Sequence, residues 1–190
     1  SNESSNIKGS KYLNEDFITT KISSMSDQIF GVRYNIYDDQ MEFQGVDNTV
    51  YSLNKTDDSI KITFTTTNES YHLFNYIDES GRKKKGYFMK LNKDGKNFIL
   101  KKHRVVFLEE QASKTGYDEP KPAMYKSMKD RIYIKFGSKE AVVLPTKKKK
   151  LAKAIFPENP KDILDFINSN SIKLSKEADL IKFANYLNTP

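Results

Sequence analysis

The sequence predicts an α+β fold, in which an antiparallel β meander is followed by a small C-terminal helical cap. Three observations support this prediction. Between residues 60 and 107, short apolar runs alternate with polar turns, and Ile60, Ile62 and Phe64 recur at every second position, the period of a strand with one buried face. The connections there are too short for the crossovers that parallel strands need. After Pro145 the apolar spacing becomes helical.

The N-terminal part is predicted to contain a leader, an arm and a first hairpin. Residues 1–11 are small and polar, which is typical of a flexible leader or the remnant of a tag. Residues 12–22 carry apolar side chains without a regular period, as expected for an extended arm on a sheet edge. Residues 31–37 and 40–44 are separated by a two-aspartate turn and predict a hairpin.

The middle of the chain is predicted to supply the remaining strands. These strands are expected at residues 50–53, 60–66, 70–77, 86–91, 97–108, 131–136 and 140–144. Asp94-Gly95 is a strong hairpin signal, and residues 109–128 have the composition of a long surface loop. We therefore expect an antiparallel β domain over residues 12–145, either an open curled sheet or one that closes like a barrel.

Three short helices are predicted in a C-terminal subdomain, residues 146–190. The first ends before Pro157, because proline cannot continue a helix. The second begins with Pro160, which suits a first helical position, after Asn159 as the cap. Ser175 suits the N-cap of the third. Each segment has one apolar side, so the subdomain is expected to pack on the sheet.

Composition limits the classes of protein that need to be considered. A chain of 190 residues can bury a core without disulfides, and the lack of cysteine removes thiol nucleophiles and thiolate metal sites. No apolar run approaches the roughly 20 residues of a membrane-spanning helix. The net charge is +7, but only four of the 32 basic residues are arginine, the side chain that grips bases and phosphates bidentately. This composition disfavours nucleic acid as the partner.

Catalytic motifs are missing from the sequence. His72 and His103, the only histidines, both fall within predicted strands, and no nucleophile elbow, HExxH or phosphate-binding loop is present. The acidic pairs occupy predicted turns, where aspartate is favoured for local backbone reasons. We expect no metal, no cofactor and no enzymatic activity. A carboxylate-dependent hydrolase is an alternative that requires two acids facing one another in a pocket.

A concave sheet face is the first candidate binding site. If the sheet curls, one face is expected to be lined by aromatic and thioether side chains, the usual setting for a small apolar or anionic ligand. The residues predicted for this face are Phe74, Tyr76, Tyr87 and Met89. The same side chains also fit an ordinary core. A protein partner bound through the sheet is the other form of this prediction.

Two basic runs form the alternative site, a patch for nucleic acid or another anionic surface. One run lies in a predicted loop and the other opens a predicted helix, where positive charge opposes the helix dipole. The residues are Arg82, Lys83, Lys84, Lys85, Lys147, Lys148, Lys149 and Lys150. If both runs share one face, they would attract anions in a salt-sensitive manner.

Two segments carry a resemblance to a known group of proteins. The segments GSKYLNEDF at residues 9–17 and RYNIYDDQMEF at residues 33–43 resemble motifs of exported Bacteroidetes proteins of the flavobacterial type, which have no assigned activity. The lysine-rich tail is similar too. The resemblance implies a β-rich body and export to the periplasm or outer envelope after removal of a signal peptide. An envelope protein, a lipid or a polysaccharide is then the expected partner. A cytoplasmic location stays open, and no functional residues carry over.

Overall fold

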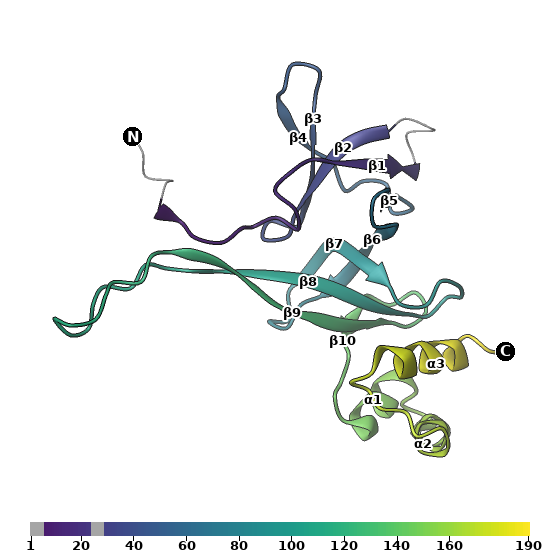
Figure 1. Cartoon of the computed structure of the whole chain (residues 1–190). Helices are drawn as coiled ribbons and strands as arrows, with labels where there is room; N and C mark the ends of the chain where they lie inside the picture. The colour runs from purple at the N-terminus through teal and green to yellow at the C-terminus, as the bar shows by residue number, and fades with distance from the viewer. Residues whose placement is uncertain (1–5, 24–28) are drawn as a thin grey trace. The chain divides into compact units, whose positions relative to one another are not determined.

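The computed structural model describes residues 6–23 and 29–190 and confirms the predicted α+β class (Figure 1). Within the described residues, ten strands form an antiparallel sheet in the order β10-β9-β8-β7-β6-β5-β1-β2-β3-β4, and three helices follow. The strands are β1 (Ile18–Ile22), β2 (Ile29–Asn35), β3 (Gln40–Gln44), β4 (Val50–Ser52), β5 (Lys61–Phe64), β6 (Glu69–Ile77), β7 (Lys83–Lys90), β8 (Phe98–Leu108), β9 (Met124–Lys135) and β10 (Val142–Val143). The helices are α1 (Lys148–Ile155), α2 (Pro160–Ser169) and α3 (Glu177–Leu187).

The chain divides into two compact units rather than one β domain with a helical appendage. The first unit comprises Ser1–Ser70 and His103–Asp130, and the second comprises Tyr71–Lys102 and Arg131–Pro190. Strands β8 and β9 are long enough to contribute one end to each unit. The β domain predicted for residues 12–145 is therefore shared between both units.

In the first unit, β1 is an internal strand rather than the predicted arm on a sheet edge. It pairs antiparallel with β2 on one side and with β5 on the other. Thr20 and Ile22 are buried on the same face, and the Thr20 hydroxyl donates to the Ile18 carbonyl at 2.7 Å. The arm prediction was wrong because β5 lies some forty residues further along the chain, and local spacing does not reveal such a partner.

The segment before β1 is also part of the first unit. The Lys8 N–H donates to the Ala123 carbonyl at 2.9 Å, and the Tyr125 N–H donates to the Lys8 carbonyl at 2.8 Å. Gly9 has a φ of 75°, and a Cβ atom there would lie 1.9 Å from the Tyr125 oxygen, so this close approach requires glycine. The flexible leader predicted for residues 1–11 is therefore wrong from Lys8 onward, and residues 1–5 lie outside the described residues.

Two strands extend into segments that were predicted to be loops. β7 begins at Lys83, which pairs with Ile77, rather than at residue 86. β9 begins at Met124, within the loop predicted for residues 109–128. The β7 extension consists of three lysines and the β9 extension mixes apolar with polar residues, and neither extension contains a fully buried side chain. The predictions stopped short because a strand that does not bury one face lacks the alternation that identifies it.

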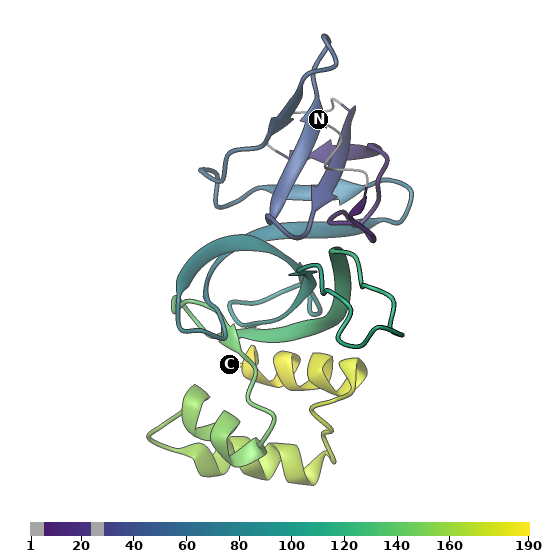
Figure 2. The same ribbon diagram turned by 90° about the vertical axis from the view of Figure 1, so that its left-hand side faces the viewer.

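The strands of the second unit close on themselves. β6 to β10 follow one another in the sheet, the Ile77 N–H donates to the Ala141 carbonyl, and the Ala141 N–H donates to the Asn75 carbonyl, both at 2.9 Å. Five sequential antiparallel strands leave the first and last running the same way, which explains why this closing bridge is parallel. Figure 2 shows the curl of these strands. Of the two predicted forms, the second unit adopts the closed one.

Aromatic side chains fill the inside of this closed sheet. Tyr76, Phe88 and Tyr133 contact one another edge to face, with ring centroids 5.1 to 5.5 Å apart. Leu100 and Ala141 complete the cluster, and all five side chains are buried. Edge-to-face packing adds to the area that the rings bury. The interior of the second unit is thus a packed core.

The position of Tyr133 in this core predicts a loss of stability in alkali. Burial, with the Glu79 carboxylate adding to it, raises the pKa of Tyr133 above its ordinary value of 10.0. The pKa of Tyr133 is higher in the folded state than in the unfolded state. The contribution of the protonated side chain to stability is therefore complete below pH 10.0 and is lost as the pH rises through the folded-state pKa. We expect the free energy of unfolding to fall above pH 10.0, and to fall less steeply in Tyr133→Phe.

Urea unfolding at a series of alkaline pH values measures this effect. The matched control is Tyr117→Phe, because the Tyr117 side chain is fully exposed and should leave the alkaline profile unchanged. Equal alkaline slopes for wild type and Tyr133→Phe would contradict the prediction.

The three helices cover the outer face of the second unit, as predicted for the helical cap. Ile99, Ile134 and Leu144 of the sheet region form one buried cluster with helix residues such as Leu151 and Phe183. The caps were partly predicted. Asn159 is the N-cap of α2, with proline in its first turn. The N-cap of α3, however, is Lys176 rather than Ser175, and it makes no side-chain cap bond.

Candidate functional site

The four residues predicted to line one concave face do not share a face. Phe74 lies directly opposite Gly86 across the β6–β7 ladder, and opposed residues point to the same side. Tyr76 lies on that side too, whereas Tyr87 and Met89 lie on the other. Phe74 and Tyr76 belong to the packed interior. The prediction of a common wall was wrong, because the pairing register, which the sequence left open, assigns each side chain to a face.

The first basic run is partly neutralised. β7 contains Lys83, Lys84 and Lys85, and Arg82 directly precedes it, so the run is not in a loop. Lys83 Nζ lies 3.5 Å from a Glu140 oxygen, and Lys84 Nζ lies 3.1 Å from an Asp78 oxygen. The Arg82 N–H also donates to Asp78 at 2.9 Å, and this bond is the main reason that the pKa of Asp78 is lowered.

The second basic run opens helix α1. Lys147 is the N-cap residue and Lys148, Lys149 and Lys150 begin the helix, all four exposed. The first turn contains no acidic residue, and Lys148 Nζ donates to Asn168 Oδ1 at 2.6 Å. Both runs belong to the second unit, but their hydrogen bonds and ion pairs join them to different residues.

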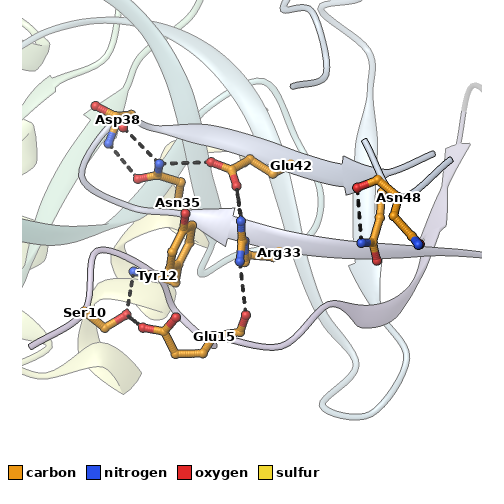
Figure 3. A network of polar contacts seen from close by, with 9 residues as sticks. Ser10, Tyr12, Glu15, Arg33, Asn35, Asp38, Glu42 and Asn48 are labelled. Carbon is orange, nitrogen blue, oxygen red and sulfur yellow. Dashed lines mark hydrogen bonds and ion pairs between the residues drawn. The ribbon is translucent and has the colours of Figure 1, made fainter. Parts of the chain in front are cut away.

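The hydrolase alternative requires two neighbouring acidic side chains, and the hairpin of β2 and β3 contains such a cluster (Figure 3). Asn35 Nδ2 donates to Asp38 Oδ2 at 2.9 Å and to Glu42 Oε2 at 3.1 Å. Arg33 in turn donates to Glu42 Oε1 through Nε at 3.1 Å and Nη2 at 2.8 Å. An arginine held this close neutralises the carboxylate. The cluster therefore serves to hold the hairpin together.

The same arginine joins the hairpin to the N-terminal segment. The guanidinium carbon of Arg33 lies 4.0 Å from the ring centroid of Tyr12 and 4.5 Å from that of Phe17. Its Nη1 also donates to the Glu15 carbonyl at 3.4 Å. Figure 3 shows how the segment from Ser10 to Glu15 lies along the hairpin. The two segments that carry the family resemblance, residues 9–17 and 33–43, thus meet in one polar network.

The two histidines lie in different strands and have different neighbours. His103 Nδ1 lies 2.9 Å from Asp130 Oδ1, an interaction between neighbouring strands β8 and β9. His72 is in β6, opposite Phe88. Over residues 6–23 and 29–190, no three histidine, aspartate or glutamate side chains are grouped so as to hold a metal ion.

The open edge of the sheet is a further candidate surface, which the patterns in the amino-acid sequence did not indicate. In the described part of the chain, β4 stands at one end of the strand order, and the other end is joined back to β6 through Ala141. Apolar side chains are exposed along and beside β4: Val46 at 109%, Val50 at 45% and Tyr51 at 46%. One signal was available in the sequence, since residues 48–54 carry no charge in a chain in which 30% of residues are charged.

The hairpin that carries this edge is held by its own hydrogen bonds. The Gly45 N–H donates to the Thr49 carbonyl at 2.8 Å, and the Thr49 N–H donates to Asp47 Oδ1 at 3.1 Å. Hydrogen bonds from Thr49 lower the pKa of Asp47, so its carboxylate stays charged in the turn. The ring of Tyr51 stacks on that of Phe43 at 5.5 Å. The edge is therefore presented in a defined conformation.

The backbone groups of β4 alternate in direction. The Thr49 carbonyl accepts from Gly45 and the Leu53 N–H donates to the Met41 carbonyl at 2.8 Å, so both face β3. In an antiparallel ladder, alternate residues point their N–H and C=O groups to opposite sides. The backbone groups of Val50 and Ser52, which lie one position away from these, are therefore directed away from β3 and along the open edge.

No family model, no curated protein and no solved structure matches this chain. The fold and the edge thus define its class as an α+β protein with an open, uncharged strand edge. None of the helices in the described part of the chain combines the length and the apolar character that crossing a bilayer requires.

Proposed function

We propose that this chain is a non-enzymatic exported protein of the cell envelope that binds a protein partner by adding a strand to β4. The observation that carries the proposal is the open edge, where the backbone groups of Val50 and Ser52 are directed outward beside exposed apolar side chains. In strand addition, main-chain hydrogen bonds supply affinity and alternate side chains supply specificity.

The other surfaces support this choice by being used within the fold. Phe74 and Tyr76 pack into the interior of the second unit. The carboxylate of Glu42 is bound by Arg33, and Lys83 and Lys84 are in ion pairs. An edge strand exposed in a soluble protein is normally protected by short length, charge, proline or a covering element, and β4 is short, with three residues. β4 has neither charge nor proline, which is expected of an edge that a partner covers.

Export rests on a different observation, the resemblance of residues 9–17 and 33–43 to exported proteins. These two segments form one network around Arg33, so the resemblance falls on residues that stabilise the fold. Fractionation of the producing cells tests this part of the proposal separately from partner binding.

Site-specific photo-crosslinking in the producing cells tests the binding. A photoreactive phenylalanine analogue in place of Tyr51 is expected to form an adduct with one defined protein, identified by mass spectrometry. The matched control places the analogue at Tyr117, whose side chain is more exposed than that of Tyr51 but lies far from β4 in sequence, in the β8–β9 connection. The control is expected to form no such adduct.

A backbone variant makes the experiment specific for strand addition. Val50→Pro removes an N–H that points away from β3, so it spares the β3–β4 ladder and blocks an added strand. The adduct at position 51 should be lost in this variant. No adduct at position 51, or an adduct that Val50→Pro leaves unchanged, would refute the proposed function.

A further inference from the structure

We infer that the strand added to β4 is β4 of a second copy of this chain, with the two strands antiparallel about a twofold axis at Tyr51. This inference rests on the proposed function, because it names the partner of the same edge. Three features of the edge support it: the direction of its backbone groups, its lack of charge and the closure of the other end of the sheet.

The backbone of β4 is suited to pair with itself. With Tyr51 on the axis, Val50 faces Ser52 of the second copy, and Ser52 faces its Val50. Both residues direct their N–H and C=O groups outward, so each of these two facing pairs exchanges two hydrogen bonds. Tyr51 then faces its own copy in a non-hydrogen-bonded position, where Cα atoms are about 4.5 Å apart and side chains are closest.

The side chains of the edge also permit self-pairing. A twofold axis brings identical residues together, and like charges placed directly opposite are destabilising. Residues 48–54 are uncharged, so two copies of this edge meet without that cost. The Tyr51 ring already stacks on Phe43 at 5.5 Å, and pairing would continue this stack across the axis. A different protein could carry charges opposite to those on the edge, so pairing with it would not require an uncharged edge.

The topology limits the assembly to two copies. In the part of the sheet that the structure describes, the end opposite β4 is bonded back to β6 by Ala141, and a twofold pairing of β4 uses the same edge of both copies. Once two β4 strands pair, both edges are used, so the assembly closes as a dimer and does not grow into a fibre. The strand is three residues long, so the interface is small and the dimer is expected to be weak.

Sedimentation velocity tests the dimer. The protein concentration should run from about 10 µM to about 1 mM, because a small interface is expected to associate weakly. The mass of the wild type is expected to rise from one copy toward two. Tyr51→Lys and Tyr51→Glu, each alone, place like charges on the axis and are expected to remain monomeric. An equimolar mixture of the two variants is expected to form the heterodimer, with an association at least about tenfold tighter than either variant alone.

The controls separate pairing at β4 from general charge effects and from misfolding. Tyr117→Lys and Tyr117→Glu should associate as the wild type does, because that side chain is exposed in the β8–β9 connection. Thermal unfolding of each Tyr51 variant alone should match the wild type, since Tyr51 is half exposed and on an edge.

The possible results distinguish this inference from the proposed function. A wild type that stays monomeric over the whole range, or a mixture that fails to associate, overturns the second copy as the partner. If photo-crosslinking at position 51 then gives an adduct with a different protein that Val50→Pro abolishes, the proposed function stands without the inference. If no adduct forms, both fail.

Discussion

Replacing Asn188 with alanine is expected to lower the free energy of unfolding of the second unit by about 3 kcal/mol. Its side-chain oxygen accepts from the N–H groups of Lys96 at 3.1 Å and Asn97 at 2.9 Å. Its amide nitrogen donates to carbonyls of Asp94, Asn97 and Ala184 at 3.3, 2.9 and 3.0 Å. One side chain thus joins the end of α3 to the β7–β8 connection, and its removal leaves backbone groups without partners.

The fit around Asn188 leaves little room for compensation. Gly95 has a φ of 108°, and a Cβ atom there would lie 2.2 Å from the Asn188 side chain. Denaturant unfolding of Asn188→Ala measures the loss. Asn185→Ala is the matched control, because it makes the same change at an exposed position of the same helix. A loss in Asn188→Ala no larger than that of the control would contradict the prediction.

Replacing Arg33 with alanine is expected to cost the first unit about 3 kcal/mol. The change removes both hydrogen bonds to Glu42, whose side chain is only 12% exposed, and leaves this carboxylate without its cation. It also removes the contacts of the guanidinium with the rings of Tyr12 and Phe17, which hold the N-terminal segment on the hairpin. We expect hydrogen exchange to increase at the Leu13 N–H, which donates to the Tyr34 carbonyl.

Two comparisons identify the cause of this loss. Arg104→Ala removes the same side chain from the same unit, where it makes one long hydrogen bond of 3.3 Å to the Lys129 carbonyl, and should cost less than about 1 kcal/mol. Adding Glu42→Gln to Arg33→Ala should recover part of the loss, because the amide needs no cation. If the double variant is as unstable as the sum of the two single variants, the ion pair is not the cause.

The sequence was most informative where a buried face repeats along a strand or helix. The alternation of Ile60, Ile62 and Phe64 predicted a strand, and all three side chains are buried, although Ile60 lies just before β5. Pro157 and Pro160 correctly marked the end of α1 and the start of α2, because the proline ring restricts the backbone locally. These signals are short-range, so the tertiary structure does not alter them.

The candidate sites were less predictable, because they depend on register and on distant partners. A shift of one residue moves a side chain to the other face, which is why Phe74 and Tyr87 were wrongly assigned to a common wall. The partners of Lys83 and Lys84 lie in other segments, so their ion pairs were not predicted. The open edge at β4 was missed because an edge is defined by the order of all the strands.

By itself, the sequence determined the α+β class, the number of helices at the C-terminus and the absence of catalytic motifs, since these follow from spacing and residue type. Only the tertiary structure decided that β6 to β10 close through Ala141, that Arg33 joins two segments, and that β4 is left open. The physical reason is that these features arise from contacts between residues far apart in the chain. The entropy of closing such loops is offset only when many of these contacts form together.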